Sequence, residues 1–175
     1  MDTINPIPND QLAPEFTLTD LKGIPHSLTD LNNRIVIINF WSAECSVSQR
    51  CDFEILSLLE RCGEQVVLLT IAANANEPPE MLAKVSAERG LPNVLLDADQ
   101  AIADLYGAQT TPHLFVLDTD GILRYQGAFD DITFRQREAT VHYLQDAVEA
   151  LLTGSKPEIP QSPPYGCVLV RYSPE

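Results

Sequence analysis

The segment 34–40 reads Arg-Ile-Val-Ile-Ile-Asn-Phe and constrains the fold of this chain more than any other segment. A continuous run of β-branched apolar residues predicts a strand that is buried on both faces, as in a parallel sheet. Trp-Ser-Ala-Glu-Cys follows at 41–45, and residues 46–61 then carry apolar side chains at helical spacing. The predicted stripe comprises Val47, Phe53, Ile55, Leu56, Leu58 and Leu59. A buried strand, a short loop and a helix therefore surround Cys45.

Strands and helices alternate over most of the remaining chain. Apolar runs predict further strands at 66–71, 94–96, 113–117 and 122–126, and helices at 78–89, 100–106 and 137–152. Asp99 is the expected N-cap of the helix at 100–106. Lys22-Gly23 and Asp120-Gly121 are turn signals that predict an N-terminal hairpin and an antiparallel return strand. The pattern indicates an α/β fold with a central mixed sheet flanked by helices.

Prolines mark both ends of this pattern. We expect an extended leader at 1–11, one globular domain at 12–154, and an extended tail at 155–175 that carries Cys167. Val-Leu-Val at 168–170 predicts a short strand within the tail. A length of 175 residues with 45% hydrophobic residues suits one domain of this kind.

The formal net charge of -14 opposes binding to phosphates, so nucleic acids and anionic membranes are not expected partners. No apolar stretch approaches the roughly 20 residues of a membrane span. The first residues, Met-Asp-Thr-Ile-Asn-Pro, lack the basic start and apolar core of a secretory signal, which predicts a cytoplasmic location. The cysteine and histidine spacing does not match zinc sites, and no metal or cofactor is expected.

Cys45 is the main candidate for chemistry. It precedes a helix, whose unpaired N–H groups and dipole favour a thiolate, the nucleophile of disulfide exchange and of peroxide attack. The second signal is Thr111-Pro112, directly before the strand at 113–117, because proline belongs at a strand start. A cis bond there would place the Thr111 backbone beside the Cys45 loop.

These motifs resemble the redoxin branch of the thioredoxin superfamily, which includes TlpA-type thiol-disulfide oxidoreductases and peroxiredoxin-like proteins. The resemblance rests on Phe-Trp-Ser-Ala-Glu-Cys at 40–45, the helix after it, Thr111-Pro112, and Phe-Val-Leu-Asp-Thr-Asp-Gly at 115–121, and it covers about residues 12–152. It implies a thioredoxin-like fold and a reaction with a protein or low-molecular-weight thiol or disulfide. It also implies that Trp41 and Glu44 lie at the substrate and that Thr111 and Pro112 dock its backbone.

The chain departs from this family at several positions. Cys-Ser-Val-Ser at 45–48 replaces Cys-x-x-Cys, so Ser48 cannot resolve a mixed disulfide formed at Cys45. Glu44 stands where an aromatic residue is common, and its carboxylate opposes thiolate formation. Asn39 cannot act as a buried carboxylate base. Ile38 occupies the position of a proline in the peroxiredoxin motif, although Ser42 matches the hydroxyl of that motif.

Other cysteines are candidates for the missing partner. Cys51 lies nearly two helical turns beyond Cys45, roughly 9 Å along the axis, too far for a disulfide without local unwinding. Cys167 is an alternative, because a flexible tail would carry it to Cys45. An unpaired cysteine packed as a small apolar group is the commoner state of such a residue, and Cys62 is expected to be structural.

Four histidine and arginine positions leave alternatives open. His113 is expected to be a satisfied strand-edge histidine, with a place near the sulfur as the alternative. Arg50 is expected on a solvated helix face, with a contact to Glu44 as the alternative. Arg124 or Arg135 would have to fold back to activate a peroxide.

Three functions remain open on the sequence alone. The first is a thiol-disulfide oxidoreductase in which Cys45 attacks and Cys167 or an external thiol resolves. The second is a thiol peroxidase. The third is a redox-inactive binding module, which the replacement at Ser48 favours.

Overall fold

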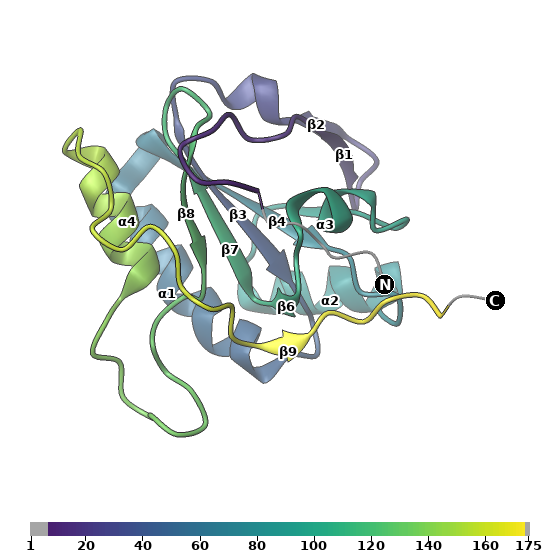
Figure 1. The fold of residues 1–175 in the computed structure, drawn as a ribbon. Coiled ribbons are helices and arrows are strands. Elements are labelled where there is room, and N and C mark those ends of the chain that lie inside the picture. The colour runs from purple at the N-terminus through teal and green to yellow at the C-terminus, as the bar shows by residue number, and fades with distance from the viewer. Residues whose placement is uncertain (1–6, 174–175) are drawn as a thin grey trace.

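A seven-stranded mixed sheet forms the centre of the computed structural model, which describes residues 7–173 (Figure 1). Its strand order is β2-β1-β5-β4-β3-β7-β8. Residues 1–6 of the predicted leader lie outside the described residues. The strands are β1 (Thr17–Asp20), β2 (Pro25–Ser27), β3 (Ile35–Trp41), β4 (Val66–Ala72), β5 (Val94–Leu96), β7 (His113–Leu117) and β8 (Leu123–Gly127).

Strand β3 is the central element that the sequence predicts. All of its residues are buried. It pairs in parallel with β4, from Ile35 opposite Val66 to Trp41 opposite Ala72, and antiparallel with β7 on its other edge. Its backbone is thus paired on both edges and its side chains are covered on both faces, as a continuous β-branched run requires.

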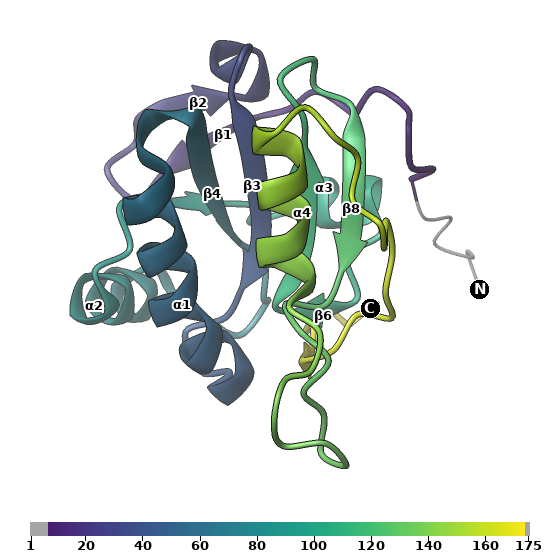
Figure 2. The same cartoon turned by 90° about the vertical axis from the view of Figure 1, so that its left-hand side faces the viewer.

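Helices cover both faces of the sheet. α1 (Ser46–Cys62) and α4 (Tyr143–Leu152) lie side by side on one face (Figure 2), and α2 (Pro79–Arg89) packs beside α1. The short helix α3 (Ala101–Tyr106) packs on the opposite face together with the N-terminal segment. The predicted mixed sheet flanked by helices is confirmed.

The predicted helix at 137–152 is wrong at its start, because α4 begins only at Tyr143. The carboxylate of Asp131 accepts the N–H groups of Thr140 and Val141, at 2.8 and 3.0 Å, and the hydroxyl of Thr140. These bonds hold the pKa of Asp131 well below its usual range. They also engage the backbone that an earlier helix would need, so residues 128–142 form a loop.

The cap of α3 also differs from the expectation. Asp99 accepts the N–H of Ala101 at 3.1 Å, but the buried Asp97 accepts the N–H groups of Ile102 and Ala103 at 3.1 and 2.7 Å. Asp97 therefore satisfies most of the free N–H groups of this helix.

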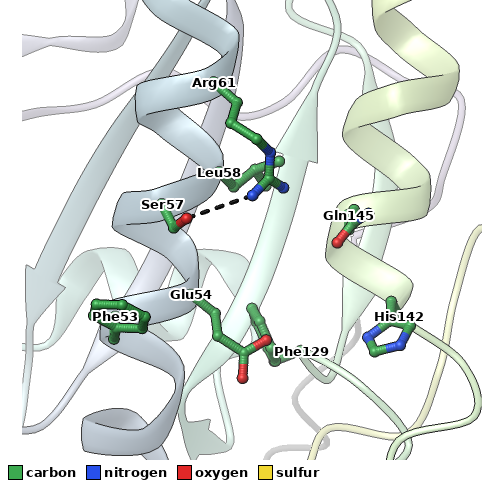
Figure 3. Close-up of a pocket in the computed structure, with 8 residues that line it drawn as sticks. All are labelled: Phe53, Glu54, Ser57, Leu58, Arg61, Phe129, His142 and Gln145. Carbon is green, nitrogen blue, oxygen red and sulfur yellow. Dashed lines mark hydrogen bonds between the residues drawn. The ribbon is translucent and has the colours of Figure 1, made fainter.

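Phe53 does not belong to the buried stripe of α1. Its side chain is 79% exposed, whereas Ile55 is fully buried. Two residues of helix correspond to about 200° of rotation, so Phe53 faces away when Ile55 faces the sheet. It stands at the rim of a pocket between α1 and α4 that Phe129 and His142 also line (Figure 3).

The C-terminal tail contacts the domain at several points between Pro160 and Tyr172. It first pairs with β8, where the Gln126 N–H donates to the Pro160 carbonyl at 3.2 Å and the Ser162 N–H donates to the Gln126 carbonyl at 3.1 Å. Further along, β9 (Cys167–Val168) pairs antiparallel with β6 (Thr110–Thr111), and Leu169 is buried in the core. The strand predicted at 168–170 is displaced: β9 covers only Cys167–Val168, so the two share Val168 alone. Within residues 7–173, no helix combines the length and apolar character needed to span a bilayer.

The burial of α1 generates a test of its orientation. Ile55→Ala should lower the free energy of unfolding by about 2–5 kcal/mol, since it leaves a cavity under the sheet. Phe53→Ala on the same helix should change it by less than about 0.5 kcal/mol, since the side chain is solvated. Denaturant unfolding of both variants measures the two values, and equal losses would contradict this orientation.

Candidate active site

Cys45 occupies the junction between β3 and α1. It is the N-cap residue of α1, its side chain is 3% exposed, and the first turn of α1 has neither a side-chain cap nor an acidic residue. The unpaired N–H groups of that turn therefore face the region of the sulfur and favour its negative charge. Its Sγ lies 3.0 Å from the Thr111 carbonyl oxygen. The Thr111–Pro112 bond is cis, as predicted, and places this carbonyl beside the Cys45 loop.

A buried carboxylate supports the loop before Cys45. The hydroxyl of Ser42 donates to Glu77 at 2.6 Å and accepts the N–H groups of Glu44 and Cys45 at 3.2 and 3.1 Å. Glu77 also accepts the N–H of Glu44 directly at 3.0 Å. The side chain of Glu44 itself is exposed. Ser42 and Glu77 thus fix the backbone from which the sulfur projects.

The other side of the loop rests on Trp41. The indole is fully buried and donates to Asp52 at 2.9 Å. Arg89 pairs with Asp52 at 3.0 Å, lies over the Trp41 ring, and donates to the carbonyl of Ala43 at 2.6 Å. Burial raises the pKa of Asp52, and the bonds from Trp41 and Arg89 oppose that effect. Trp41 is therefore a support beneath the loop.

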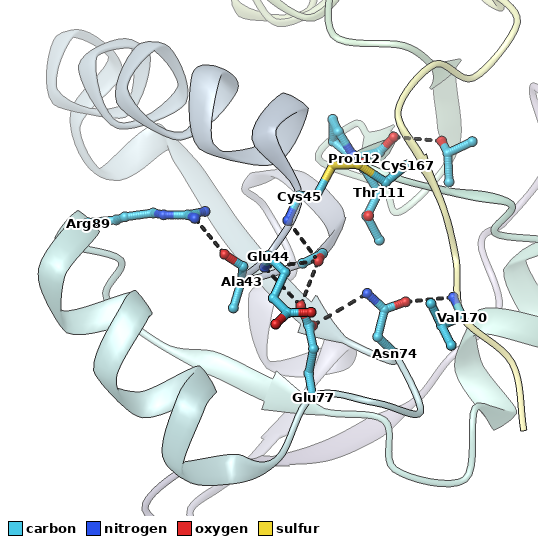
Figure 4. Close-up of a disulfide and its surroundings, with 12 residues drawn as sticks. Ala43, Glu44, Cys45, Asn74, Glu77, Arg89, Thr111, Pro112, Cys167 and Val170 are labelled. Carbon is cyan, nitrogen blue, oxygen red and sulfur yellow. Dashed lines mark hydrogen bonds between the residues drawn. A yellow bond between two sulfur atoms is a disulfide. The ribbon is translucent and has the colours of Figure 1, made fainter.

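Cys45 and Cys167 are joined by a disulfide, with their Cα atoms 6.0 Å apart (Figure 4). The pairing of β6 with β9 sets Cys167 opposite Thr111. The commoner expectation, an unpaired Cys167, is therefore wrong, because strand pairing fixes the tail at the one position where the two sulfurs meet.

Gly166 is required for this close approach. A Cβ atom on Gly166 would lie 2.2 Å from the Thr111 carbonyl oxygen and 3.0 Å from Cδ of Pro112. A side chain at this position would push the tail away from the site.

After Cys167, hydrogen bonds at Val170 hold the tail against the domain. The Val170 N–H donates to Asn74 at 2.8 Å, and the Val170 carbonyl accepts from the Ala75 N–H at 3.0 Å and from Gln100 at 2.8 Å. Asn74 in turn donates to Glu77 at 3.4 Å. The tail and the Cys45 loop therefore share one hydrogen-bonded network (Figure 4).

The other cysteines do not take part in this pair. Cys51 is fully buried and unpaired, and burial raises its pKa to about 12, so the alternative Cys45–Cys51 disulfide is not formed. Cys62 is partly buried and also unpaired. Ser48 is fully buried in α1, and its hydroxyl has no hydrogen-bond partner within residues 7–173.

The arginine candidates contact groups other than Cys45. Arg50 forms two hydrogen bonds with the buried Asp130, at 2.7 and 2.9 Å, so both expectations for Arg50 are wrong. Arg124 pairs with Asp10 and Asp118, and Arg135 lies over Phe134. These arginines are engaged elsewhere and do not contact Cys45.

His113 is buried and satisfied, as the sequence favoured. Its Nδ1 accepts the N–H of Gln109 at 3.2 Å, and its ring stacks on Phe115. Burial lowers its pKa to about 4. Among the described residues, no group of three or more acidic, histidine or cysteine side chains is arranged to hold a metal ion.

Comparison with known proteins agrees with this geometry. The model of the AhpC/TSA family matches residues 10–126. The chain belongs to this family. The prediction of a redoxin-branch member of the thioredoxin superfamily is thereby confirmed, and the family is one of thiol-disulfide oxidoreductase-like proteins.

Several relatives have named activities. The chain is 29% identical over 113 residues to thiol-disulfide oxidoreductase ResA of Geobacillus thermodenitrificans, covering 62% of this chain and 63% of that protein. It is 30% identical over 124 residues to a Mycobacterium tuberculosis protein provisionally named a peroxiredoxin, covering 68% of this chain and 76% of that protein. The chain therefore spans about 63% of the length of its ResA relatives.

A solved structure matches more of the chain than these relatives do. An uncharacterised conserved protein of Geobacillus kaustophilus superposes with a TM-score of 0.87 at 27% identity, over 96% of this chain and 94% of that protein. Because 96% of this chain is covered, the structural similarity extends over much of the segment after residue 154.

Sequence reasoning missed Glu77, Asn74, Gln100 and Arg89. Glu77 and Asn74 follow β4, which is parallel to β3, and the ends of neighbouring parallel strands meet at one edge of a sheet. That rule could have placed both residues near Cys45. Nothing local in the sequence marks Gln100 or Arg89, whose partners lie far away in the chain.

The burial of His113 predicts a pH dependence of stability. Its folded-state pKa of about 4 lies below the unfolded value, so protons favour the unfolded chain. The stabilisation is complete above about pH 6.5 and falls by up to roughly 3 kcal/mol as pH drops toward 4. In His113→Asn, this decrease in the free energy of unfolding between pH 7 and pH 4 should disappear. His142→Gln, at an exposed position, should keep the wild-type slope, and a wild-type slope in His113→Asn would contradict the assignment.

Gly166→Ala should weaken the docking of Cys167. The equilibrium constant for forming the Cys45–Cys167 disulfide against a glutathione buffer should fall by about tenfold or more, roughly 1.4 kcal/mol. The position has no positive φ, so the effect would come from the contact with Thr111. Ser155→Ala, at an exposed tail residue, is the control, and an unchanged constant in Gly166→Ala would disprove the close approach.

Proposed function

We propose that this chain is a thiol-disulfide oxidoreductase in which Cys45 and Cys167 form the redox pair. The observation that carries the proposal is the disulfide between a cysteine at the N-terminus of α1 and a cysteine held opposite Thr111 by strand pairing. Cys167 supplies the second thiol that Ser48 cannot provide. The two cysteines that form the disulfide therefore come from two separate segments, whereas those of a Cys-x-x-Cys motif belong to one helix.

The reaction balances as a two-electron exchange. In the reduced protein the two thiols reduce a substrate disulfide, and the Cys45–Cys167 disulfide forms while two substrate thiols leave. In the opposite direction two external thiols reduce the pair and become a disulfide. The substrates are protein or low-molecular-weight thiols and disulfides, in keeping with the ResA relative.

Two other functions make different demands on the site. A thiol peroxidase is favoured by the family and by the mycobacterial relative. Of the two arginines considered for activating peroxide, however, Arg124 pairs with Asp10 and Asp118, and Arg135 lies over the ring of Phe134. A redox-inactive binding module would use the Thr111 edge for a partner, and β9 occupies that edge. The cytoplasmic location stays a prediction. In a reducing cytosol the disulfide would be a transient catalytic species.

The test uses single cysteine replacements in the full chain. The native protein should reduce insulin disulfides with dithiothreitol as electron donor, and both Cys45→Ser and Cys167→Ser should lose this activity by at least about tenfold, because each removes one half of the pair. Cys62→Ser, at a partly buried cysteine outside the pair, is the matched control and should keep full activity.

The same variants separate the alternatives. Turnover of hydrogen peroxide that exceeds disulfide reduction and needs Cys45 would favour the peroxidase. Absence of turnover with both substrates would favour the binding module. Thiol alkylation across pH, read by peptide mass, should show Cys45 titrating at a lower pH than Cys62.

A further inference from the structure

The two sulfurs of the disulfide lie in unequal surroundings. Cys45 is 3% exposed, beneath the tail and beside the Thr111 carbonyl. Cys167 is an exposed residue, and the next residue, Val168, is 78% exposed. Disulfide exchange requires a thiolate to reach the sulfur that it attacks, so access favours the tail cysteine.

Contacts other than the disulfide also hold the tail against the domain. Upstream of Cys167, the buried Ser162 hydroxyl lies 2.7 Å from the Tyr125 hydroxyl and accepts the Ala128 N–H at 3.0 Å. Downstream, the Leu169 N–H donates to the Gln109 carbonyl at 3.0 Å, and Leu169 is packed in the core.

The clamp around Val170 adds to this anchoring. Gln100 is 5% exposed and donates both to the Val170 carbonyl and to the Ala73 carbonyl, at 2.8 and 2.6 Å. It also accepts the Tyr172 N–H at 3.3 Å. Because these bonds do not involve either cysteine, we expect them to persist when the disulfide is reduced, with the tail still covering Cys45.

The stability of the leaving thiolate also favours attack at Cys167. The sulfur that leaves carries the electron pair of the broken bond, and a thiol of lower pKa leaves faster. Cys45 is the N-cap of a 17-residue helix with no acidic residue in its first turn, whereas Cys167 lies in a two-residue strand. The dipole and free N–H groups of α1 therefore stabilise a leaving thiolate at Cys45 and not at Cys167.

We propose that external thiols and disulfides exchange at Cys167, and that Cys45 is the buried thiolate that leaves and later resolves. This proposal rests on the proposed redox pair and reverses the roles expected from the sequence. Since β9 already occupies the Thr110–Thr111 edge, the partner presents an accessible sulfur and does not pair its backbone there.

Each step balances. In reduction, an external thiolate attacks Sγ of Cys167, a mixed disulfide forms on Cys167, and the bonding pair passes to Cys45. A second external thiolate attacks the external sulfur of the mixed disulfide and releases Cys167 as a thiolate. In oxidation, Cys167 attacks a substrate disulfide and releases one thiolate. Cys45 then attacks Sγ of Cys167 and releases the second.

The first experiment maps the mixed disulfide in the oxidised full-length protein. A neutral thiol, 2-mercaptoethanol, is mixed with it, and the reaction is stopped at early times with excess N-ethylmaleimide, which alkylates the free thiols and so halts exchange. The masses of the peptides are then measured. We expect mercaptoethanol on Cys167 and maleimide on Cys45, in excess on the order of tenfold at the earliest times.

The opposite labelling, with mercaptoethanol on Cys45, would overturn this proposal and leave the redox pair intact. Failure of the redox pair itself is distinguishable, because the disulfide-reductase activity would then survive in Cys45→Ser or in Cys167→Ser.

Single-cysteine reactivity provides a second measurement. With 2-hydroxyethyl disulfide, Cys45 in Cys167→Ser should react about tenfold more slowly than Cys167 in Cys45→Ser, because the tail stays docked. Adding Gln100→Ala to Cys167→Ser should loosen the tail and raise the rate at Cys45. Gln145→Ala, at an exposed position on α4, is the matched control. A faster Cys45 that is insensitive to Gln100→Ala would contradict the proposal.

Discussion

The site depends on a strand that has no free edge and no free face. β3 is paired with β4 and β7 and buried along its whole length, so the position where it ends is fixed by the core. The end of β3 in turn fixes the position of the loop after Trp41 and of the start of α1. Ser42, Glu77 and Arg89 then hold the loop by hydrogen bonds to its backbone. The sulfur of Cys45 is consequently placed by the sheet and not by a flexible connection.

The second constraint is the pairing of two very short strands. β6 and β9 contain two residues each, too few to be stable alone. Leu169 in the core and the bonds to Asn74 and Gln100 provide the additional stabilisation. The partner cysteine therefore comes from a segment that is folded against the domain. This arrangement brings a second cysteine to Cys45 although Ser48 replaces the second cysteine of Cys-x-x-Cys.

A docked partner cysteine changes how such a site meets its substrate. In a Cys-x-x-Cys motif both thiols belong to one loop and helix, and a substrate strand can reach the Thr–Pro edge. Here the tail fills that edge and covers Cys45, while Cys167 stays at the surface. Cys167 is thus the more accessible of the two cysteines and Cys45 lies at the helix N-terminus, and the proposed order of exchange is based on that difference.

Much of the fold was predictable because its signals are local. The β-branched run of β3, the stripe of α1 and the turn at Asp120-Gly121 each determine their own segment, and Thr111-Pro112 marked the start of β7. The local pattern gave a wrong start for α4, because the carboxylate of Asp131 in the preceding loop binds the backbone of residues 140 and 141.

By itself, the sequence determined that Cys45 lies at a helix N-terminus after a buried strand, and that Ser48 cannot be its partner. Only the tertiary structure decided that Cys167 is that partner and that Glu77, Asn74 and Gln100 hold the two segments together. The reason is that helix ends and buried strands follow from neighbouring residues. The pairing of β6 with β9 instead joins segments more than fifty residues apart in the chain, and its hydrogen bonds leave no mark on the local sequence.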